Sequence, residues 1–330
     1  MTKQTVSIIG GGAWGTALAC AARRAGNDVI LWARNQNVVQ NINQDQLNTT
    51  YLPDVALIDG IKATNDMADA LKSADSVLLV TPSQHLRAIC KQAQPFIGPI
   101  PVAICAKGVE RGTDALMSDV VTTELPQVKI GVLSGPTFAK EVARGLPTAV
   151  TLACEDAQAG NQLVAAIGAP TFRPYLSDDI IGVEIGGAVK NVLAIACGII
   201  MGRSLGDNAR AALITRGLAE MGRLAAKLGA KPDTVMGLSG LGDLTLTCSS
   251  PQSRNMSFGI LLGQGQSKQE ILDSRNAVTE GVWSASSVTD LAHKVGVNMP
   301  ICEAVNQIVT NNADIDETIE ILLARPFKPE

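Results

Sequence analysis

The sequence predicts an α/β protein with an N-terminal Rossmann-type, doubly wound sheet followed by an all-helical C-terminal domain. Three patterns support this fold class: a glycine cluster between two apolar runs near the N-terminus, apolar β-type runs that alternate with helical segments, and helical periodicity alone beyond about residue 187. Strands that alternate with helices indicate a mostly parallel sheet. A chain of 330 residues is about twice the usual length of one domain.

The first 34 residues have the pattern strand, tight turn, helix, strand. The turn carries G-x-G-x-x-G at Gly10, Gly12 and Gly15. Such glycines allow a tight turn, close approach of the backbone to a pyrophosphate, and close packing of helix on strand. The following helix N-terminus offers free N–H groups and a positive dipole end to phosphates. The segment therefore predicts a dinucleotide site, the alternative being a glycine-rich surface turn.

Coenzyme choice is expected to depend on the end of the second strand, where the chain has Arg34 and Asn35. A carboxylate there would bond the adenosine ribose and repel a 2′-phosphate. Because Arg34 stands there instead, we expect NADP to be accepted. NAD remains possible, since an arginine can also stack on adenine.

Composition narrows the class of protein. Net charge is −4, and the lysines and arginines are scattered, which is atypical of a surface for nucleic acid or anionic membranes. The seven cysteines stand singly in apolar stretches, as in a protein of a reducing compartment. With only His85 and His293 and no Cys/His cluster, no metal site is expected. The N-terminus leaves no room for a signal peptide, and the apolar stretch at residues 192–201 is too short to span a membrane. We therefore expect a cytoplasmic protein without membrane insertion.

Further strands and helices are expected in order along the chain. After the first unit, strands are predicted at residues 76–80, 101–105, 129–133 and 149–152, and helices at 84–93 and 114–124. Ligands of such sheets bind at the carboxyl ends of the strands, so the loops at residues 81–83, 106–108 and 134–137 are expected to line the site.

Beyond residue 187 only helices are predicted. Residues 188–201 are almost wholly apolar, as in a buried helix, and apolar residues from 214 to 228 repeat at spacings of four and three up to Gly229, a predicted C-cap. Later helices are expected at residues 283–295, 300–311 and 316–324. The expected domains are residues 1–187, which bind the nucleotide, and residues 188–330, which bind substrate and carry the catalytic group.

Lys190 stands out because it lies near the start of the apolar helix predicted over residues 188–201. Burial and a helix N-terminus both lower the pKa of a lysine, so this amine is expected to exchange a proton with an alcohol. A lysine that extends from a helix end to water is the alternative.

Three further segments carry side chains suited to binding a substrate or cofactor. Lys107 follows a predicted strand, and its ammonium is expected to point toward the cofactor. Asp243 lies in LSGLGDL, where glycines allow close backbone approach. Ser253, Arg254 and Asn255 supply a hydroxyl, a guanidinium and an amide, which suit a phosphate monoester. Each of these is also compatible with an ordinary surface loop.

In this order, the motifs resemble those of the soluble, bacterial-type NAD(P)-dependent sn-glycerol-3-phosphate dehydrogenases. The matching segments are residues 10–18, 31–35 and 105–108, SGPTFAKE at 134–141, GGAVKN at 186–191, LSGLGDL at 238–244, residues 253–255 and TEGV at 279–282. The resemblance implies reversible reduction of dihydroxyacetone phosphate to sn-glycerol 3-phosphate with NADP or NAD, a role in phospholipid synthesis, and a homodimer.

The resemblance also implies roles for individual residues. It places the general acid/base on Lys190, which also contacts substrate, and the phosphate on Arg254 and Asn255. The implied substrate-binding residues are Lys107, Gly135, Thr137, Asn191, Asp243, Thr247, Ser253, Arg254 and Asn255. The implied cofactor-binding residues are Gly10, Gly12, Ala13, Trp14, Gly15, Arg34, Lys107, Ala139, Arg254, Val278 and Glu280.

Two other hypotheses remain. β-Hydroxyacid and 6-phosphogluconate-type dehydrogenases also join a Rossmann domain to a helical one and carry a lysine and asparagine after a glycine-rich stretch, as at residues 186–191. The LSGLGD motif and residues 253–255 distinguish this chain from them. A non-catalytic dinucleotide-binding sensor would need neither Lys190 nor Asp243.

Overall fold

The computed structural model describes residues 3–274 and 278–326. The chain divides into two compact units. Unit 1 comprises Met1–Lys107 and Ala115–Glu184, and unit 2 comprises Gly108–Asp114 and Ile185–Glu330. The chain therefore passes from unit 1 to unit 2 twice, after Lys107 and after Glu184. The second of these points lies inside the helix Ile180–Gly202.

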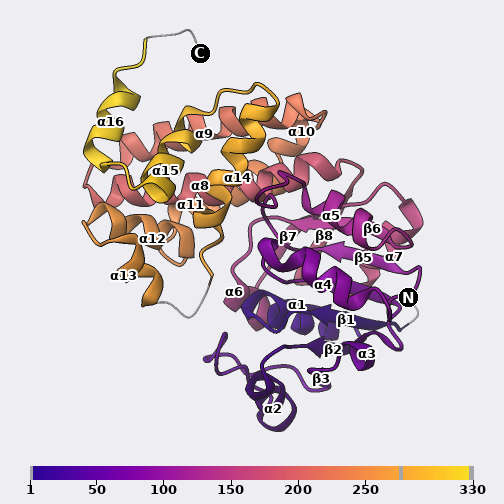
Figure 1. Ribbon diagram of the computed structural model, residues 1–330. Coiled ribbons are helices and arrows are strands. Elements are labelled where there is room, and N and C mark those ends of the chain that lie inside the picture. The colour runs from indigo at the N-terminus through magenta and orange to yellow at the C-terminus, as the bar shows by residue number, and fades with distance from the viewer. Residues whose placement is uncertain (1–2, 275–277, 327–330) are drawn as a thin grey trace. The chain divides into compact units, whose positions relative to one another are not determined.

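Unit 1 contains an eight-stranded sheet in the order β3-β2-β1-β4-β5-β6-β7-β8 (Figure 1). All neighbouring strands are parallel except β6 and β7, which are antiparallel. The strands are β1 (Thr5–Ile9), β2 (Asp28–Trp32), β3 (Ile61–Thr64), β4 (Ser76–Leu79), β5 (Pro101–Ile104), β6 (Lys129–Ser134), β7 (Thr148–Ala153) and β8 (Phe172–Ser177). The predicted α/β fold class is confirmed. The sequence patterns predict neither of the edge strands, β3 and β8.

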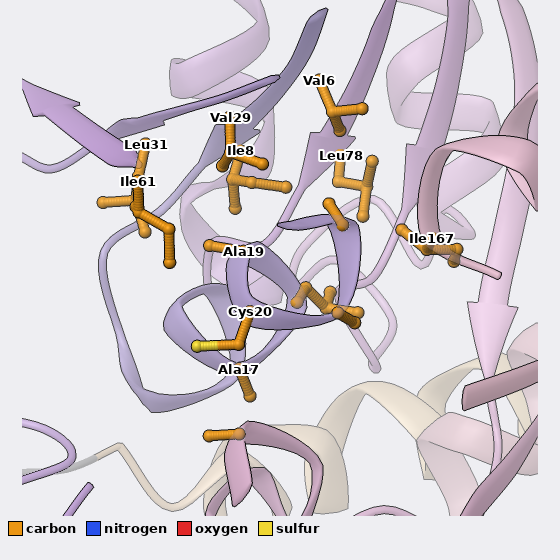
Figure 2. Close-up of a cluster of buried hydrophobic side chains, with 14 of the residues drawn as sticks. Val6, Ile8, Ala17, Ala19, Cys20, Val29, Leu31, Ile61, Leu78 and Ile167 are labelled. Carbon is orange, nitrogen blue, oxygen red and sulfur yellow. The ribbon is translucent and has the colours of Figure 1, made fainter. Parts of the chain in front are cut away.

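Helices cover both faces of this sheet. They are α1 (Ala13–Arg24), α2 (Gln36–Asp45), α3 (Met67–Leu71), the 3₁₀ turn η1 (Ser83–His85), α4 (Leu86–Ala93), α5 (Met117–Glu124), α6 (Ala139–Arg144) and α7 (Ala157–Ile167). Successive side chains of a strand point to opposite faces, so Ile8 belongs to one buried cluster and Ile9 to the other. On the first face, Ala19 of α1 lies next to Ile8, and Ala17 and Cys20 of the same helix belong to the same buried cluster (Figure 2).

In the described part of unit 2, the regular structure is helical. Its elements are α8 (Ile180–Gly202), which begins in unit 1, α9 (Asp207–Lys227), α10 (Pro232–Val235), the π-helical turn η2 (Leu238–Gly242), α11 (Asp243–Ser249), α12 (Arg254–Gly263), α13 (Lys268–Asp273), α14 (Glu280–Lys294), α15 (Pro300–Asn311) and α16 (Ile315–Leu323). The helix predicted at residues 300–311 has those bounds. Gly229, just past α9, has the positive φ of +93° expected of a C-cap glycine.

The prediction that the long apolar helix begins near residue 188 is wrong. Helix α8 begins at Ile180, and the carboxylate of Asp179 accepts a hydrogen bond of 2.9 Å from the Gly182 N–H in its first turn. Glycine is a poor helix former, so the glycines at residues 182–187 favoured an interruption of the helix. In the fold, Gly186 is needed for packing, because a Cβ there would lie 2.4 Å from the carbonyl oxygen of Ser239.

At 23 residues, α8 is also longer than the apolar stretch expected from the sequence. By length and composition alone it could cross a membrane. However, 83% of its most apolar 18-residue window is buried inside the structure, as in the core helix of a soluble protein.

Candidate active site

The glycine turn between β1 and α1 has the geometry of an anion cradle. Gly10 has φ +132°, and a Cβ there would lie 2.6 Å from the carbonyl oxygen of Val80. A Cβ on Gly15 would lie 1.8 Å from the Gly10 oxygen, whereas a Cβ on Gly12 would meet no atom within 4 Å. Gly12 is the N-cap of α1, and no side chain of the described residues caps that end. The open space and the uncapped N–H groups fit a dinucleotide pyrophosphate.

Other residues with an implied cofactor role stand around this turn or follow neighbouring strands in unit 1. Arg34 follows β2 and is exposed, and its guanidinium has no hydrogen-bond or ion-pair partner among the described residues. Ala13 and Trp14 open α1, and Ala139 opens α6. The indole N–H of Trp14 is buried and likewise lacks a partner within the described ranges.

Lys107, Gly135 and Thr137 are brought together at the carboxyl ends of β5 and β6. The ammonium of Lys107 donates a hydrogen bond of 3.3 Å to the carbonyl oxygen of Gly135, and the Thr137 hydroxyl donates one of 3.3 Å to the same atom. Gly135 has φ +152°, and a Cβ there would lie 2.9 Å from the Cα of Val150. These three residues therefore form one group in unit 1, as expected from the loops that follow parallel strands.

Lys190 lies in the interior of unit 2. Its Nζ is 2.8 Å from Oδ1 of Asp243 and 2.9 Å from the Thr247 hydroxyl, which itself donates to the Asp243 carboxylate over 3.2 Å. The Lys190 side chain is 9% exposed and that of Asp243 1% exposed. The carboxylate and hydroxyl compensate the ammonium for the water lost on burial. The predicted position near a helix N-terminus is wrong, because α8 begins at Ile180 and the dipole effect fades within the first turn.

The LSGLGDL segment brings Asp243 to Lys190 through close backbone packing. Its first five residues form the π-helical turn η2, after which Asp243 opens α11. A Cβ on Gly240 would lie 1.9 Å from the Val235 oxygen, and one on Gly186 would lie 2.4 Å from the Ser239 oxygen. Glycine is thus required at two contacts of η2: Gly240 where it packs against α10, and Gly186 where α8 packs against it, one turn before Lys190.

A buried amide network stands next to Lys190. The side-chain amide of Asn255 donates to Oδ1 of Asn191 over 2.8 Å, and Oδ1 of Asn255 accepts from the Gly281 N–H over 2.9 Å. Asn191 in turn donates to the carbonyl oxygen of Gly187 over 3.3 Å. The network links α8, the first turn of α12 and the first turn of α14.

Four glycines allow the backbones of α12 and α8 to come into direct contact. A Cβ on Gly198 would lie 2.1 Å from the Met256 oxygen, and one on Gly259 would lie 2.1 Å from the Ile195 oxygen. Gly202 and Gly263 form a second such contact one turn further along. This crossing places the N-terminus of α12 beside the segment of α8 that carries Lys190 and Asn191.

Ser253 and Arg254 begin α12. The Ser253 hydroxyl caps the helix by accepting a hydrogen bond of 3.2 Å from the Met256 N–H. The Arg254 side chain is exposed, although the surrounding protein desolvates its guanidinium and lowers the pKa. The carboxylate of Glu280 opposes that shift. Arg254 remains a cation at neutral pH and can present its fork to an anion.

The structure assembles two groups of the predicted site residues. One, in unit 1, contains the glycine turn and the Lys107 group; the other, in unit 2, contains Lys190, Asn191, Asp243, Thr247 and residues 253–255. Val278 is exposed and precedes α14, which Glu280 opens. Asn48 is not among the residues predicted from the sequence, although its side chain contacts the glycine turn across 37 positions of sequence. No motif signal marks it.

Comparison with known proteins identifies the family. A model of the NAD-dependent glycerol-3-phosphate dehydrogenase N-terminus matches residues 5–160, and the C-terminal model matches residues 179–320. Proteins named glycerol-3-phosphate dehydrogenase [NAD(P)+] from Parvibaculum lavamentivorans and Caulobacter vibrioides are 55% and 56% identical to this chain. The alignments cover all of this chain and 99% and 100% of those proteins.

A solved structure agrees with these relatives. The crystal structure of glycerol-3-phosphate dehydrogenase from Coxiella burnetii is 42% identical, with a TM-score of 0.94 over 98% of this chain and 99% of that chain. The resemblance inferred from the motifs is confirmed. The chain belongs to the family of NAD(P)-dependent glycerol-3-phosphate dehydrogenases.

Proposed function

We propose that this protein reduces dihydroxyacetone phosphate reversibly to sn-glycerol 3-phosphate with NADPH or NADH, and that the product supplies phospholipid synthesis. The observation that carries the proposal is the buried Lys190 ammonium, 2.8 Å from Asp243 and 2.9 Å from Thr247, in a chain of this family. A buried, paired lysine is a suitable proton donor for a ketone oxygen.

Lys190 acts as the general acid in the reductive direction. When bound, NADPH or NADH would supply the hydride for C2 of the ketone. The Lys190 ammonium gives one proton to the C2 oxygen, so that the carbonyl becomes an alcohol. Asp243 and Thr247 hold Nζ in place during this transfer. In the oxidative direction, the neutral amine removes the same proton. A positioned group of this kind typically contributes about 10²–10⁴-fold to the rate.

Arg254 and Asn255 bind the phosphate of the substrate in this proposal. Arg254 offers a guanidinium fork at an exposed position, and Asn255 is fixed by the amide network. Other substrate contacts are assigned to Ser253 and Asn191 in unit 2 and to the Lys107 group in unit 1. The coenzyme is assigned to the glycine turn, with Trp14, Arg34, Lys107, Ala139, Arg254, Val278 and Glu280 as further contacts.

The proposal extends to organisation and location. We assign nucleotide binding to residues 1–187 and substrate binding to residues 188–330, in a cytoplasmic homodimer. The domain assignment is supported by the division of contacts after Glu184. Light scattering coupled to size-exclusion chromatography would measure the molar mass of the protein in solution. The mass of a monomer would contradict the proposed homodimer and would leave the proposed reaction unaffected.

Steady-state kinetics test the reaction itself. The purified protein should consume NADPH and NADH when dihydroxyacetone phosphate is added. It should not reduce NADP or NAD with a β-hydroxyacid or 6-phosphogluconate. Lys190→Met should lose turnover, whereas Lys227→Met at the exposed end of α9 should retain it. Reduction of dihydroxyacetone phosphate by Lys190→Met at the wild-type rate would refute the assignment of the general acid.

A further inference from the structure

Asn48 connects a remote segment of unit 1 to the glycine turn. It follows α2, outside any helix or strand, and is fully buried. Its side-chain NH₂ donates two hydrogen bonds, of 3.0 Å to the carbonyl oxygen of Gly11 and of 2.8 Å to the Thr16 hydroxyl. Its Oδ1 accepts one of 3.1 Å from the Tyr51 N–H. The amide thus uses both donor protons, one on the glycine turn and one on helix α1.

The hydrogen bond to Gly11 determines the direction of a neighbouring N–H. The carbonyl of Gly11 and the N–H of Gly12 belong to one trans peptide, so they point in opposite directions. When Asn48 holds the Gly11 oxygen, the Gly12 N–H is turned to the other side of the turn. Gly12 is also the position where the turn is open, with no atom within 4 Å of an added Cβ.

This restraint matters because the backbone of glycine is less restricted than that of any other residue. A Gly–Gly peptide without a partner can rotate at little cost, and that freedom must be lost when an anion binds. Thr16 extends the restraint into α1, since its N–H donates to the Gly12 oxygen over 2.9 Å. Asn48 therefore holds the orientation of the turn before any ligand arrives.

We propose that Asn48 is a positioning residue of the dinucleotide site: it orients the Gly11–Gly12 peptide so that the Gly12 N–H faces the coenzyme pyrophosphate. The inference rests on the proposed assignment of the glycine turn as the coenzyme site. Asn48 acts through Gly11 and Thr16 and is not assigned a contact with the coenzyme.

Asn27 offers a matched control for the test. It is also buried in unit 1, and its NH₂ also donates to two acceptors, the carbonyl oxygens of Ala165 and Ala166 at 3.0 and 2.9 Å. Its Oδ1 accepts from the Gln4 N–H over 3.0 Å. Asn48→Asp and Asn27→Asp therefore remove the same number of donated hydrogen bonds with no change of shape, and only the first removes one from the glycine turn.

The experiment measures the Kd of NADPH by fluorescence titration without substrate, together with the Tm of each variant. We expect Asn48→Asp to raise Kd at least tenfold, because a carboxylate oxygen replaces the donor that faces the Gly11 oxygen. Asn27→Asp should lower the Tm by a similar amount and leave Kd within twofold. In kinetics, Asn48→Asp should raise the KM of NADPH and change the KM of dihydroxyacetone phosphate less than twofold.

Two results would overturn the inference: an Asn48→Asp Kd within twofold of wild type, or an equal rise of Kd in Asn27→Asp. If Asn48→Asp does not fold, Thr16→Val tests the same inference. We expect it to raise the Kd of NADPH two- to fivefold. An unchanged Kd would contradict the inference. Gly12→Val distinguishes failure of the proposed coenzyme site from failure of the proposed role of Asn48. If it leaves Kd unchanged, the proposed coenzyme site fails and the inference with it; if it abolishes binding while Asn48→Asp has no effect, only the role of Asn48 fails.

Discussion

Lys190 and Asp243 form a buried ion pair with an Nζ–Oδ1 distance of 2.8 Å, although 53 positions of sequence separate them. Each lies on a different helix, α8 or α11, and Gly186 of α8 lets the Ser239 backbone, just before α11, approach. The pair serves two purposes in the proposed enzyme, since it keeps a charged amine inside the protein and directs that amine's proton.

Removal of Lys190 should separate these purposes. In Lys190→Met, kcat should fall by about 10²-fold or more, and the free energy of unfolding should fall by about 3–5 kcal/mol, because Asp243 remains buried without its partner. Urea unfolding and steady-state kinetics measure the two effects. The double variant Lys190→Met, Asp243→Leu should recover stability and stay inactive. Recovery of activity in the double variant would show that Lys190 is not the general acid.

Arg254 should matter chiefly for substrate affinity. A charge-assisted hydrogen bond contributes about 1.5–3 kcal/mol, so Arg254→Ala should raise the KM of dihydroxyacetone phosphate by about ten- to a hundredfold. Arg254→Lys keeps the charge and loses the guanidinium fork, so its KM should lie between those of the wild type and Arg254→Ala. An unchanged KM in Arg254→Ala would mean that another residue anchors the phosphate.

The contact between α8 and α12 should tolerate no side chain at Gly259. In Gly259→Ala the added Cβ would lie 2.1 Å from the Ile195 oxygen, so the helices must separate. We expect a loss of about 1–3 kcal/mol in the free energy of unfolding, as for overpacking, and reduced activity because Asn255 moves with α12. The matched control is Gly222→Ala on α9, where a Cβ meets nothing within 4 Å and should stabilise the helix. Equal effects of the two substitutions on the Tm would argue against the close helix contact.

Glu184 should make stability depend on pH. The pKa of its carboxyl is raised from 4.5 to about 7; burial is the largest cause, the Ser118 hydrogen bonds oppose it, and the charge of Asp119 adds to it. Because the folded pKa exceeds the unfolded value, the protonated form favours the folded state. The contribution of Glu184 to the free energy of unfolding is fully present below about pH 4.5 and is lost as pH rises through 7.

Glu184→Gln tests this sign. The difference in free energy of unfolding between variant and wild type should shift in favour of the variant by about 3 kcal/mol between pH 4 and pH 8. Urea unfolding at both pH values measures it, and the comparison cancels groups that titrate in both proteins. A difference independent of pH would show that Glu184 does not titrate in this range.

Arg34 should affect the two coenzymes unequally. It is exposed at the end of β2, where a 2′-phosphate would meet a cation instead of a carboxylate. Arg34→Ala should raise the KM of NADPH about tenfold or more, as for a lost charge-assisted contact, and change that of NADH less. Kinetics with both coenzymes measure the ratio. An equal change for both would favour stacking on adenine over binding of the extra phosphate.

The predictions that held rest on local patterns. Gly10 adopts the positive φ that its residue type allows, and the helix predicted at 300–311 begins with a proline that suits a first turn. Predictions failed where distant contacts override local preference. The glycines at residues 182–187 favour an interruption, but α8 continues through them because Gly186 packs on the backbone of Ser239.

By itself, the sequence determined the α/β class, the glycine turn and the family, because turn geometry, alternation of apolar runs and motif order are properties of neighbouring residues. The tertiary structure alone decided which partners meet. It set Asp243 and Thr247 against Lys190, and Asn48 against Gly11, through contacts between segments that are far apart in the chain. Such contacts depend on how whole helices and strands pack, and a single side chain such as Asn48 carries no local signal of the backbone that it will hold.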